Sequence, residues 1–353
     1  MKKIILTGGG TAGHVTPNIA LIPKLKEHGW EIEYIGSVDG IEKQLINTID
    51  IPYHSIASGK LRRYFSLQNF TDPLKVLKGI FQAISIIKKI KPKIIFSKGG
   101  FVTVPIVIAG YLNKVPVIIH ESDITPGLAN KLSATFAKKI CTSFSETLKY
   151  LPSEKAIHTG TPIRKELIEG DSNKGFEFTG LKGNKSVLLV IGGSLGSEKI
   201  NKAIREIADK LLYDFDIVQI CGKGNVDHNF NKEGYKQFEY ISSGLPDVFA
   251  IADIVVSRAG SNAIFDLLAL KKPNLLIPLS KKSSRGDQIL NAESFEKAGF
   301  SKVLYEDDLT AETLFNSIHK LNMEKDKYIN KMEENRDKES IDEIINLIEK
   351  CAL

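Results

Sequence analysis

Two glycine-rich segments carry the first chemical signal in this 353-residue chain. A short β-branched run, Lys2 to Thr7, precedes Gly8-Gly9-Gly10-Thr11-Ala12-Gly13-His14, and a second run, Lys185 to Ile191, precedes Gly192-Gly193-Ser194-Leu195-Gly196-Ser197. Glycines after a strand let the backbone approach phosphate oxygens, and the next helix offers free N–H groups and the positive end of its dipole. The two segments therefore predict phosphate binding at two places.

Each glycine-rich segment also matches a rival motif by letter. Residues Gly8 to Gly13 fit the dinucleotide pattern G-x-G-x-x-G, with Asp39 as the ribose-binding carboxylate. Residues Gly192 to Gly196 fit the G-x-S-x-G nucleophile elbow of hydrolases. The dinucleotide motif leaves the second segment without a role. The hydrolase motif is weakened because its serine would follow the first strand of a second domain, whereas an elbow serine is expected deep within one α/β domain. Both motifs, and the plain alternative of tight turns, stay open.

Titratable side chains stand beside these segments. His14 lies at the N-terminus of a predicted helix, where the dipole favours a neutral imidazole that can accept a proton. Glu121 and Asp123 follow the apolar run Val115 to Ile119, so we expect them at the ligand face of a parallel sheet. A helix N-cap made by Ser122 or Asp123 is the structural alternative.

The second half of the chain repeats the pattern of polar residues after apolar runs. Arg258-Ala259-Gly260-Ser261-Asn262 follows the run Ile254 to Ser257, and a helix beginning there would direct its N–H groups toward a ligand. Gln288 follows the run near Pro278 and could hydrogen-bond sugar hydroxyls. Each feature alone is ordinary turn chemistry, but four polar strand ends together predict one large site.

The elements that position these residues alternate between short apolar runs and helical stretches. This alternation predicts two doubly wound, Rossmann-like α/β lobes with ligands in a cleft between them. We expect an N-terminal lobe over residues 1–163, a second lobe over 164–335, and a C-terminal helix over 336–353 that can pack back on the N-terminal lobe. Ser340 and Glu343 predict a capping box for that helix. Pro23 predicts a kink or an early end in the first helix.

Composition limits the classes of function. Residues 1–165 hold 23 Lys and Arg against 11 Asp and Glu, a net charge of +12, whereas the remainder carries −6. The basic half suggests phosphates or an anionic membrane, and the chain lacks the signatures of a nucleic-acid binder. No apolar stretch is long enough to span a bilayer, and the three cysteines lie too far apart to suggest a metal site, which fits a reducing cytoplasm.

One basic and aromatic region stands out, from Lys60 to Lys89. It contains aromatic and aliphatic side chains among Lys and Arg, and then a helix predicted to begin at Pro73. Core burial is the default for the helix's aliphatic stripe. The aromatic loop before it suits the boundary of an anionic bilayer. We therefore predict a peripheral contact with an anionic membrane surface.

Taken together, the motifs resemble the MurG family of peptidoglycan transferases over nearly the whole chain, in order and spacing. The matching segments are Gly9 to Pro17, Lys98 to Val102, His120 to Lys131, Gly192 to Gly196, Arg258 to Ser261, and Gly286 to Gln288. The resemblance implies a GT-B fold and an inverting, metal-independent transfer of N-acetylglucosamine from UDP-GlcNAc to the C4 hydroxyl of the muramoyl sugar of lipid I, giving lipid II. It also implies a peripheral enzyme on the cytoplasmic side of the cell membrane.

By position, the resemblance assigns His14 as the preferred general base and Glu121 as its rival. It places the donor UDP-GlcNAc against Thr11, Ala12, Gly13, Asp123, Arg164, Ser194, Ile241, Ser261, Asn262, Ala263, Ile264, Asp266 and Gln288. Asp123 stands where the family often has asparagine, and Asp266 where it usually has a ribose-binding glutamate. No metal and no other cofactor is expected.

Two other functions share parts of this pattern. A UDP-GlcNAc 2-epimerase would have the same two-lobed architecture but would not need the basic, aromatic region. A membrane-bound nucleotide-sugar sensor would keep the loops of the second lobe and tolerate loss of His14 and Glu121.

Overall fold

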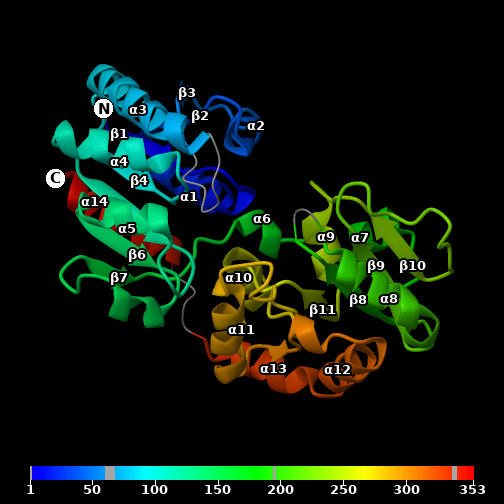
Figure 1. Ribbon diagram of the computed structural model, residues 1–353. Coiled ribbons are helices and arrows are strands. Elements are labelled where there is room, and N and C mark those ends of the chain that lie inside the picture. Colours follow the sequence, from blue (N-terminus) through cyan, green and yellow to red (C-terminus); the bar gives the residue numbers. More distant parts are fainter. Residues whose placement is uncertain (1, 60–67, 194–195, 336–339) are drawn as a thin grey trace. The chain divides into compact units, whose positions relative to one another are not determined.

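The chain folds into two compact units in the computed structural model, which describes residues 2–59, 68–193, 196–335 and 340–353. The first unit comprises Met1–Arg164 with Glu339–Leu353, and the second comprises Lys165–Lys338 (Figure 1). Each unit has its own parallel sheet covered by helices.

The first unit is built on a seven-stranded parallel sheet in the order β3-β2-β1-β4-β5-β6-β7. Its strands are β1 (Lys2–Thr7), β2 (Trp30–Ser37), β3 (Tyr53–Ile56), β4 (Ile94–Ser97), β5 (Val117–Glu121), β6 (Lys139–Thr142) and β7 (Ala156–His158). Its helices are α1 (Thr16–Glu27), α2 (Ile41–Ile46), α3 (Gln68–Ile90), α4 (Thr103–Leu112) and α5 (Leu128–Ala134), with short 3₁₀ turns η1 (Ala12–His14) and η2 (Ser145–Tyr150).

Alternation along the strands creates two separate apolar layers. Ile4 and Leu6 of β1 point into one layer, which α1 covers, whereas Ile5 points into the opposite layer, which α3 and α4 cover. Successive side chains of a strand face opposite sides of the sheet, so a strand buried on both faces must be apolar throughout. This requirement explains the continuous apolar run of β1.

The C-terminal helix α14 (Ser340–Ala352) completes the first layer. Ile344, Ile345 and Ile348 are buried against the layer that α1 covers, and the carboxylate of Glu349 accepts a hydrogen bond of 2.8 Å from the Trp30 indole. Figure 1 accordingly shows the last helix of the chain among elements of the first unit.

The second unit repeats the strand order of the first. Its six-stranded parallel sheet has the order β10-β9-β8-β11-β12-β13. The strands are β8 (Ser186–Ile191), β9 (Phe215–Ile220), β10 (Tyr235–Phe238), β11 (Ile254–Ser257), β12 (Asn274–Leu276) and β13 (Lys302–Val303). The helices are α6 (Lys165–Ile168), α7 (Ser172–Thr179), α8 (Glu198–Leu211), α9 (Leu245–Ile251), α10 (Ser261–Ala269), α11 (Asp287–Lys297), α12 (Ala311–Met323) and α13 (Lys325–Glu333), with the 3₁₀ turn η3 (Glu306–Asp308).

Both sheets reverse their winding direction beside their first strand. In the first unit β1 lies between β2 and β4, and in the second unit β8 lies between β9 and β11. The loops after two neighbouring strands diverge at such a switch point, which is where open α/β sheets bind ligands. Both glycine-rich segments therefore lie at switch points.

The doubly wound α/β prediction is confirmed for both units, and the local errors have physical causes. Five short strands, β3, β6, β7, β10 and β13, were not predicted because two to four half-polar residues carry little periodic signal. Helix α1 continues through Pro23 to Glu27, so the predicted early end is wrong. Helix α3 begins at Gln68 instead of Pro73. Ser340, which was predicted to cap the last helix, is the first residue within α14. Among the described residues no helix is long and apolar enough to cross a membrane.

We predict that Ile348→Ala destabilises the first unit by about 2–5 kcal/mol, because it opens a cavity in a layer that cannot fully collapse. The only tryptophan of the chain, Trp30, is 4% exposed within that layer, so its fluorescence in urea reports unfolding of this unit. Asn346→Ala, on the exposed side of the same helix, is the control and should change the midpoint little. Equal effects of both substitutions would contradict this packing.

Candidate functional site

The loops after β1 and β4 touch each other at the switch point of the first unit. The Gly9 N–H donates to the Gly99 carbonyl at 3.2 Å, and the Lys98 N–H donates to the Thr7 carbonyl at 2.8 Å. Gly100 has a φ of +91°, and a Cβ there would lie 2.1 Å from the Gly9 oxygen. Any side chain at this position would therefore separate the two loops.

His14 lies over this contact, on the turn η1. Its Nδ1 is 3.0 Å from the Gly9 carbonyl oxygen and 3.2 Å from the Thr11 hydroxyl. A carbonyl can only accept, so Nδ1 carries the proton and Nε2 keeps a lone pair in the neutral ring. Desolvation and the positive charge of Lys98 lower the His14 pKa, although Gly9, Asp123 and Glu42 oppose the shift. The neutral, proton-accepting form is thus favoured near neutral pH.

Glu42, at the start of α2, is a site residue that the sequence analysis did not identify. Its carboxylate is fully buried and accepts from the Gly10 N–H at 3.1 Å, the Ser37 N–H at 3.0 Å and the Ser37 hydroxyl at 2.5 Å. Glycines at positions 9, 36 and 40 leave the room for it, since an added Cβ at each would meet its side chain. The sequence signal that could have identified Glu42 is a glutamate that follows the second strand and has glycines nearby.

This arrangement weakens the dinucleotide alternative. Asp39, the carboxylate which that motif would use for a ribose, is exposed. The acidic residue that does reach the glycine loop is Glu42, and its oxygens are occupied by protein donors. A carboxylate directed inward in this way is not placed to bind a ribose hydroxyl.

Glu121, the last residue of β5, holds the following loop. Its Oε1 accepts from the N–H groups of Ser122 and Asp123 at 2.8 and 3.0 Å, and its Oε2 accepts from the Gly127 N–H and the Asn130 amide at 2.9 and 2.8 Å. Burial and the nearby Asp123 charge raise its pKa. Four donors on two oxygens make Glu121 a structural acceptor, and they place Asp123 near His14, whose pKa its charge raises.

A buried cation lies beneath the same loops. The Lys98 ammonium is 2.6 Å from His120 Nδ1 and donates to the Ser122 hydroxyl at 2.7 Å, and the residue is 1% exposed. His120 Nε2 is 2.9 Å from the Gly160 carbonyl, so its proton is on Nε2 and Nδ1 accepts from Lys98. Desolvation lowers the Lys98 pKa to about 7. The sequence analysis named this segment but gave Lys98 no role.

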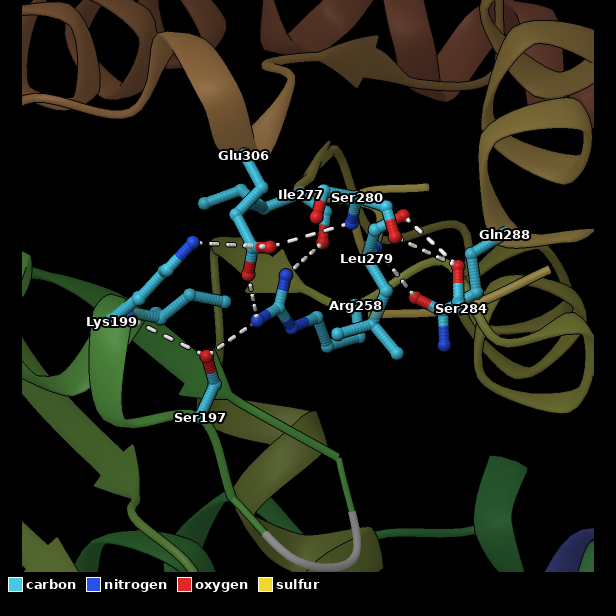
Figure 2. Close-up of polar contacts among 10 residues, drawn as sticks. Ser197, Lys199, Arg258, Ile277, Leu279, Ser280, Ser284, Gln288 and Glu306 are labelled. Carbon is cyan, nitrogen blue, oxygen red and sulfur yellow. Dashed lines mark hydrogen bonds and ion pairs between the residues drawn. The ribbon is translucent and has the colours of Figure 1, made fainter. Parts of the chain in front are cut away.

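In the second unit, Arg258 joins the loops at the switch point (Figure 2). Its guanidinium donates to the Ser197 hydroxyl at 2.7 Å, the Ile277 carbonyl at 3.0 Å and the Glu306 carboxylate at 2.5 Å. Ser197 is also the N-cap of α8. One side chain thus ties the loop after β8, the end of β12 and the turn η3 together.

Glu306 is the second functional carboxylate that sequence reasoning missed. Besides Arg258, it accepts from the Ser280 N–H at 3.3 Å and pairs with Lys199 at 3.4 Å (Figure 2). Burial alone would raise its pKa, but its bonds to Arg258 and the Ser280 N–H outweigh burial and lower it. The residue lies in a run of three acidic residues, where the sequence indicates only a solvated turn.

The predicted donor residues of the second unit occupy the ends of β11 and β12. Ser261, Asn262, Ala263 and Ile264 form the first turn of α10, with Asp266 on the next turn, and the Gly260 N-cap supplies no side-chain cap. Gln288 lies in the first turn of α11, where its Oε1 accepts from the Leu279 N–H at 3.1 Å (Figure 2).

Other predicted donor residues are more scattered. Ile241 is buried beyond the end of β10, and Arg164 is the last residue of the first unit before the chain enters the second. Thr11, Ala12 and Gly13 lie on the glycine loop of the first unit. Ser194, central to both the diphosphate and hydrolase hypotheses, lies outside the described residues. Among the residues that the structure describes, no three His, Cys, Asp or Glu side chains group in a way that could hold a metal ion.

Two doubly wound units with glycine-rich loops at both switch points are the GT-B architecture of glycosyltransferases. Residues 4–142 match the glycosyltransferase family 28 N-terminal domain, and residues 187–348 match the family 28 C-terminal domain. The chain therefore belongs to glycosyltransferase family 28 and, within it, to the MurG family that the sequence resembles.

Curated relatives match over nearly their full length. A Clostridium tetani protein named UDP-N-acetylglucosamine--N-acetylmuramyl-(pentapeptide) pyrophosphoryl-undecaprenol N-acetylglucosamine transferase is 61% identical, covering 99% of this chain and 98% of its own. A protein of the same name from Clostridium kluyveri is 59% identical, covering 99% of both chains.

Solved structures agree on the fold. Acinetobacter baumannii MurG matches with a TM-score of 0.77 at 22% identity, over 99% of this chain and all of that one. The UDP-GlcNAc 2-epimerase of Neisseria meningitidis, whose crystal structure contains UDP-GlcNAc, matches with a TM-score of 0.66 at 16% identity, over 99% of this chain and 100% of that chain. At these identities both show the architecture alone.

We predict that Lys98 makes the stability of the first unit rise with pH. Its ordinary pKa is 10.5 and its folded pKa about 7, so below pH 7 both states keep the proton and the folded state bears the full desolvation cost. From about pH 7 to 10 only the unfolded state keeps the proton, so the free energy of unfolding increases with pH. Relative to Lys98→Met, the gain should approach about 1.4 kcal/mol per pH unit.

Urea unfolding followed by Trp30 fluorescence, between pH 6 and pH 9, measures this difference. Lys78→Met, an exposed lysine of the same unit, is the matched control and should run parallel to the unsubstituted chain. Parallel curves for Lys98→Met as well would show that the folded lysine keeps its proton.

Proposed function

We propose that this chain transfers N-acetylglucosamine from UDP-GlcNAc to the C4 hydroxyl of the muramoyl sugar of lipid I, giving lipid II for peptidoglycan synthesis. The observation that carries the proposal is 61% identity, across 99% of the chain, to a protein named for that transfer. Substrate class follows full-length identity of this order far better than it follows fold, since the epimerase fold is shared at only 16% identity.

The second unit has the features of a donor diphosphate site. Helices α10 and α11 follow the N-cap residues Gly260 and Gly286, neither of which supplies a side-chain cap, so the positive end of each helix dipole lies at the ligand edge of the sheet. As the bond to UDP breaks, negative charge grows on the leaving diphosphate. We propose that these helix termini stabilise it without a bound cation. Gln288 would donate its amide to the sugar, because its oxygen is already occupied by Leu279.

His14 is our proposed general base. The acceptor hydroxyl attacks the anomeric carbon, UDP leaves from the opposite face, and the hydroxyl proton passes to His14 Nε2 while Nδ1–H stays on the Gly9 carbonyl. The four donors around Glu121 suit a positioning role better, because proton transfer would require it to exchange one of them for substrate.

We also propose that α3 contacts an anionic membrane at its cytoplasmic face. Leu74, Leu77 and Phe81 share one side of this helix and are 68%, 52% and 71% exposed, so the core burial expected for them is wrong. Exposed lysines, including Lys75 and Lys78, flank them. Residues 60–67 of the predicted region, and the side chains of 68–71, lie outside the described part of the chain.

The transfer is tested by incubating the protein with labelled UDP-GlcNAc and a lipid I analogue. The expected product is labelled lipid II with an inverted, β-configured linkage and free UDP. Epimerised UDP-sugar without lipid product would identify an epimerase, and unchanged UDP-GlcNAc despite binding would identify a sensor. Both outcomes would overturn the proposal.

In the same assay, His14→Ala should lower kcat by about 10²–10⁴-fold, the usual contribution of a general base, while donor affinity measured by calorimetry changes little. Thr16→Val is a nearby control, since its hydroxyl donates to the Ala12 carbonyl. An equal loss of donor affinity and turnover, or near-normal turnover, would reassign the base.

We predict that replacing Leu77 and Phe81 by serine weakens binding to anionic vesicles by at least about tenfold, because two large apolar side chains no longer enter the interface. Flotation at low and high salt measures binding, and Lys78→Ala should weaken mainly the salt-sensitive part. Tyr213→Ser, an aromatic residue that is 83% exposed in the second unit, is the control. Unchanged flotation of the double variant would exclude α3 as the contact.

A further inference from the structure

The peptide group between Gly9 and Gly10 connects two titratable side chains. Its carbonyl oxygen lies 3.0 Å from His14 Nδ1, and its N–H donates to Glu42 Oε2 at 3.1 Å. The two hydrogen bonds engage opposite ends of one planar, delocalised amide. Carboxylate, peptide and imidazole therefore form a continuous chain of hydrogen bonds.

The surroundings of Glu42 indicate an ionised carboxylate. The Gly10 N–H donates to one of its oxygens and the Ser37 N–H and hydroxyl donate to the other, and an N–H group, which can only donate, favours the charged acceptor. The side chain is fully buried, so water does not screen the charge on its way to the peptide.

We propose that Glu42 is a positioning residue for the transfer reaction, acting on His14 through the Gly9–Gly10 peptide. The inference rests on the proposed function, in which His14 is the base. A negative charge on the N–H side of an amide polarises it and makes its carbonyl a stronger acceptor. The Gly9 oxygen then holds the Nδ1–H tautomer and stabilises the imidazolium that forms when Nε2 takes the acceptor proton.

This arrangement performs the task of the aspartate in a serine-protease triad, with a peptide bond inserted between acid and histidine. The inserted peptide serves a purpose here. A carboxylate in direct contact with His14 would place a full charge close to a site that must accept an anionic diphosphate lipid. Because Glu42 lies behind the loop, its charge acts on His14 through the peptide group, while protein donors occupy the oxygens of its carboxylate.

Other charges also face these two groups. Lys98, after β4, lowers the His14 pKa, and Asp123, after β5, raises it together with Glu42 and the Gly9 carbonyl. Tyr34 on β2 and Tyr53 on β3 are the titratable groups that face Glu42, and its charge contributes to raising the pKa of both phenols. Both phenols therefore stay neutral, and Lys98 is the group whose titration must be separated from that of His14.

The test compares Glu42→Gln with Asp39→Asn, which removes an exposed carboxylate from the same connection between β2 and α2. Removing the Glu42 charge should lower the His14 pKa, so the acidic limb of the kcat/KM profile moves to lower pH by about half a unit or more, and kcat falls about tenfold. Asp39→Asn should change neither. A fall in kcat with an unmoved acidic limb would reduce Glu42 to a structural residue and overturn the inference.

A second variant tests the opposite sign. Ser37→Ala removes the hydroxyl donor 2.5 Å from the carboxylate, so Glu42 keeps more charge for the Gly10 N–H, and the acidic limb should move to higher pH. Lys98→Met in each background separates the lysine titration. If Glu42→Gln does not fold, as judged by Trp30 fluorescence, a Ser37→Ala profile that is unchanged or shifted to lower pH contradicts the proposal.

An activity-independent readout separates this inference from the proposed function. The ring ¹⁵N shifts of His14, titrated without substrate, should give a lower pKa in Glu42→Gln than in Asp39→Asn. If the unsubstituted protein fails to make lipid II, the proposed function falls but this comparison still stands. If it makes lipid II and the His14 titration is identical in both variants, the coupling is absent.

Discussion

The loops that follow the first and fourth strands of each sheet are joined directly, and the candidate site residues of each unit depend on that contact. In the first unit the backbones themselves meet, with the Gly9 N–H on the Gly99 carbonyl. In the second unit the Arg258 side chain performs the same task by reaching Ser197. Parallel strands end side by side, so only loops without intervening side chains, or loops tied by one buried side chain, can build a shared surface there.

Buried charges then determine what each surface can do. Glu42 and Glu121 in the first unit and Glu306 in the second all have protein donors on both of their oxygens. An internal carboxylate with satisfied hydrogen bonds holds irregular loops at a fixed position, whereas one without partners would be too costly to bury. Two buried cations of the described residues, Lys98 and Arg258, differ in kind. Arg258 is paired with Glu306, while Lys98 donates to neutral groups, and desolvation lowers its pKa.

The different chemical features of the two units are consistent with a family 28 transferase. The first unit combines a neutral histidine with an exposed apolar helix face among lysines, as an enzyme with a lipid-linked acceptor requires. The second unit places the N-termini of two helices with glycine N-caps after β11 and β12, where the helix dipole favours an anion. The first unit also has a switch-point loop, but there the carboxylate of Glu42 accepts a hydrogen bond from the Gly10 N–H.

Much of the fold and of the candidate site was determined by the sequence itself. Apolar runs buried on both faces, glycines where no side chain fits, and polar residues after each strand specify a doubly wound fold and its ligand edge, because these signals are local and repeat in both halves. His14, Glu121 and Gln288 could be named from the sequence because they lie within those strand-end segments. Glu42 and Glu306 could not be named in this way, because a glutamate that accepts hydrogen bonds in the interior and a glutamate in a solvated turn look alike in the sequence. The tertiary structure alone brought Glu42 to a peptide group 32 residues away. It also exposed the α3 face that periodicity assigned to the core, and it placed the last helix on the first unit. All three depend on contacts between segments that are distant in the sequence.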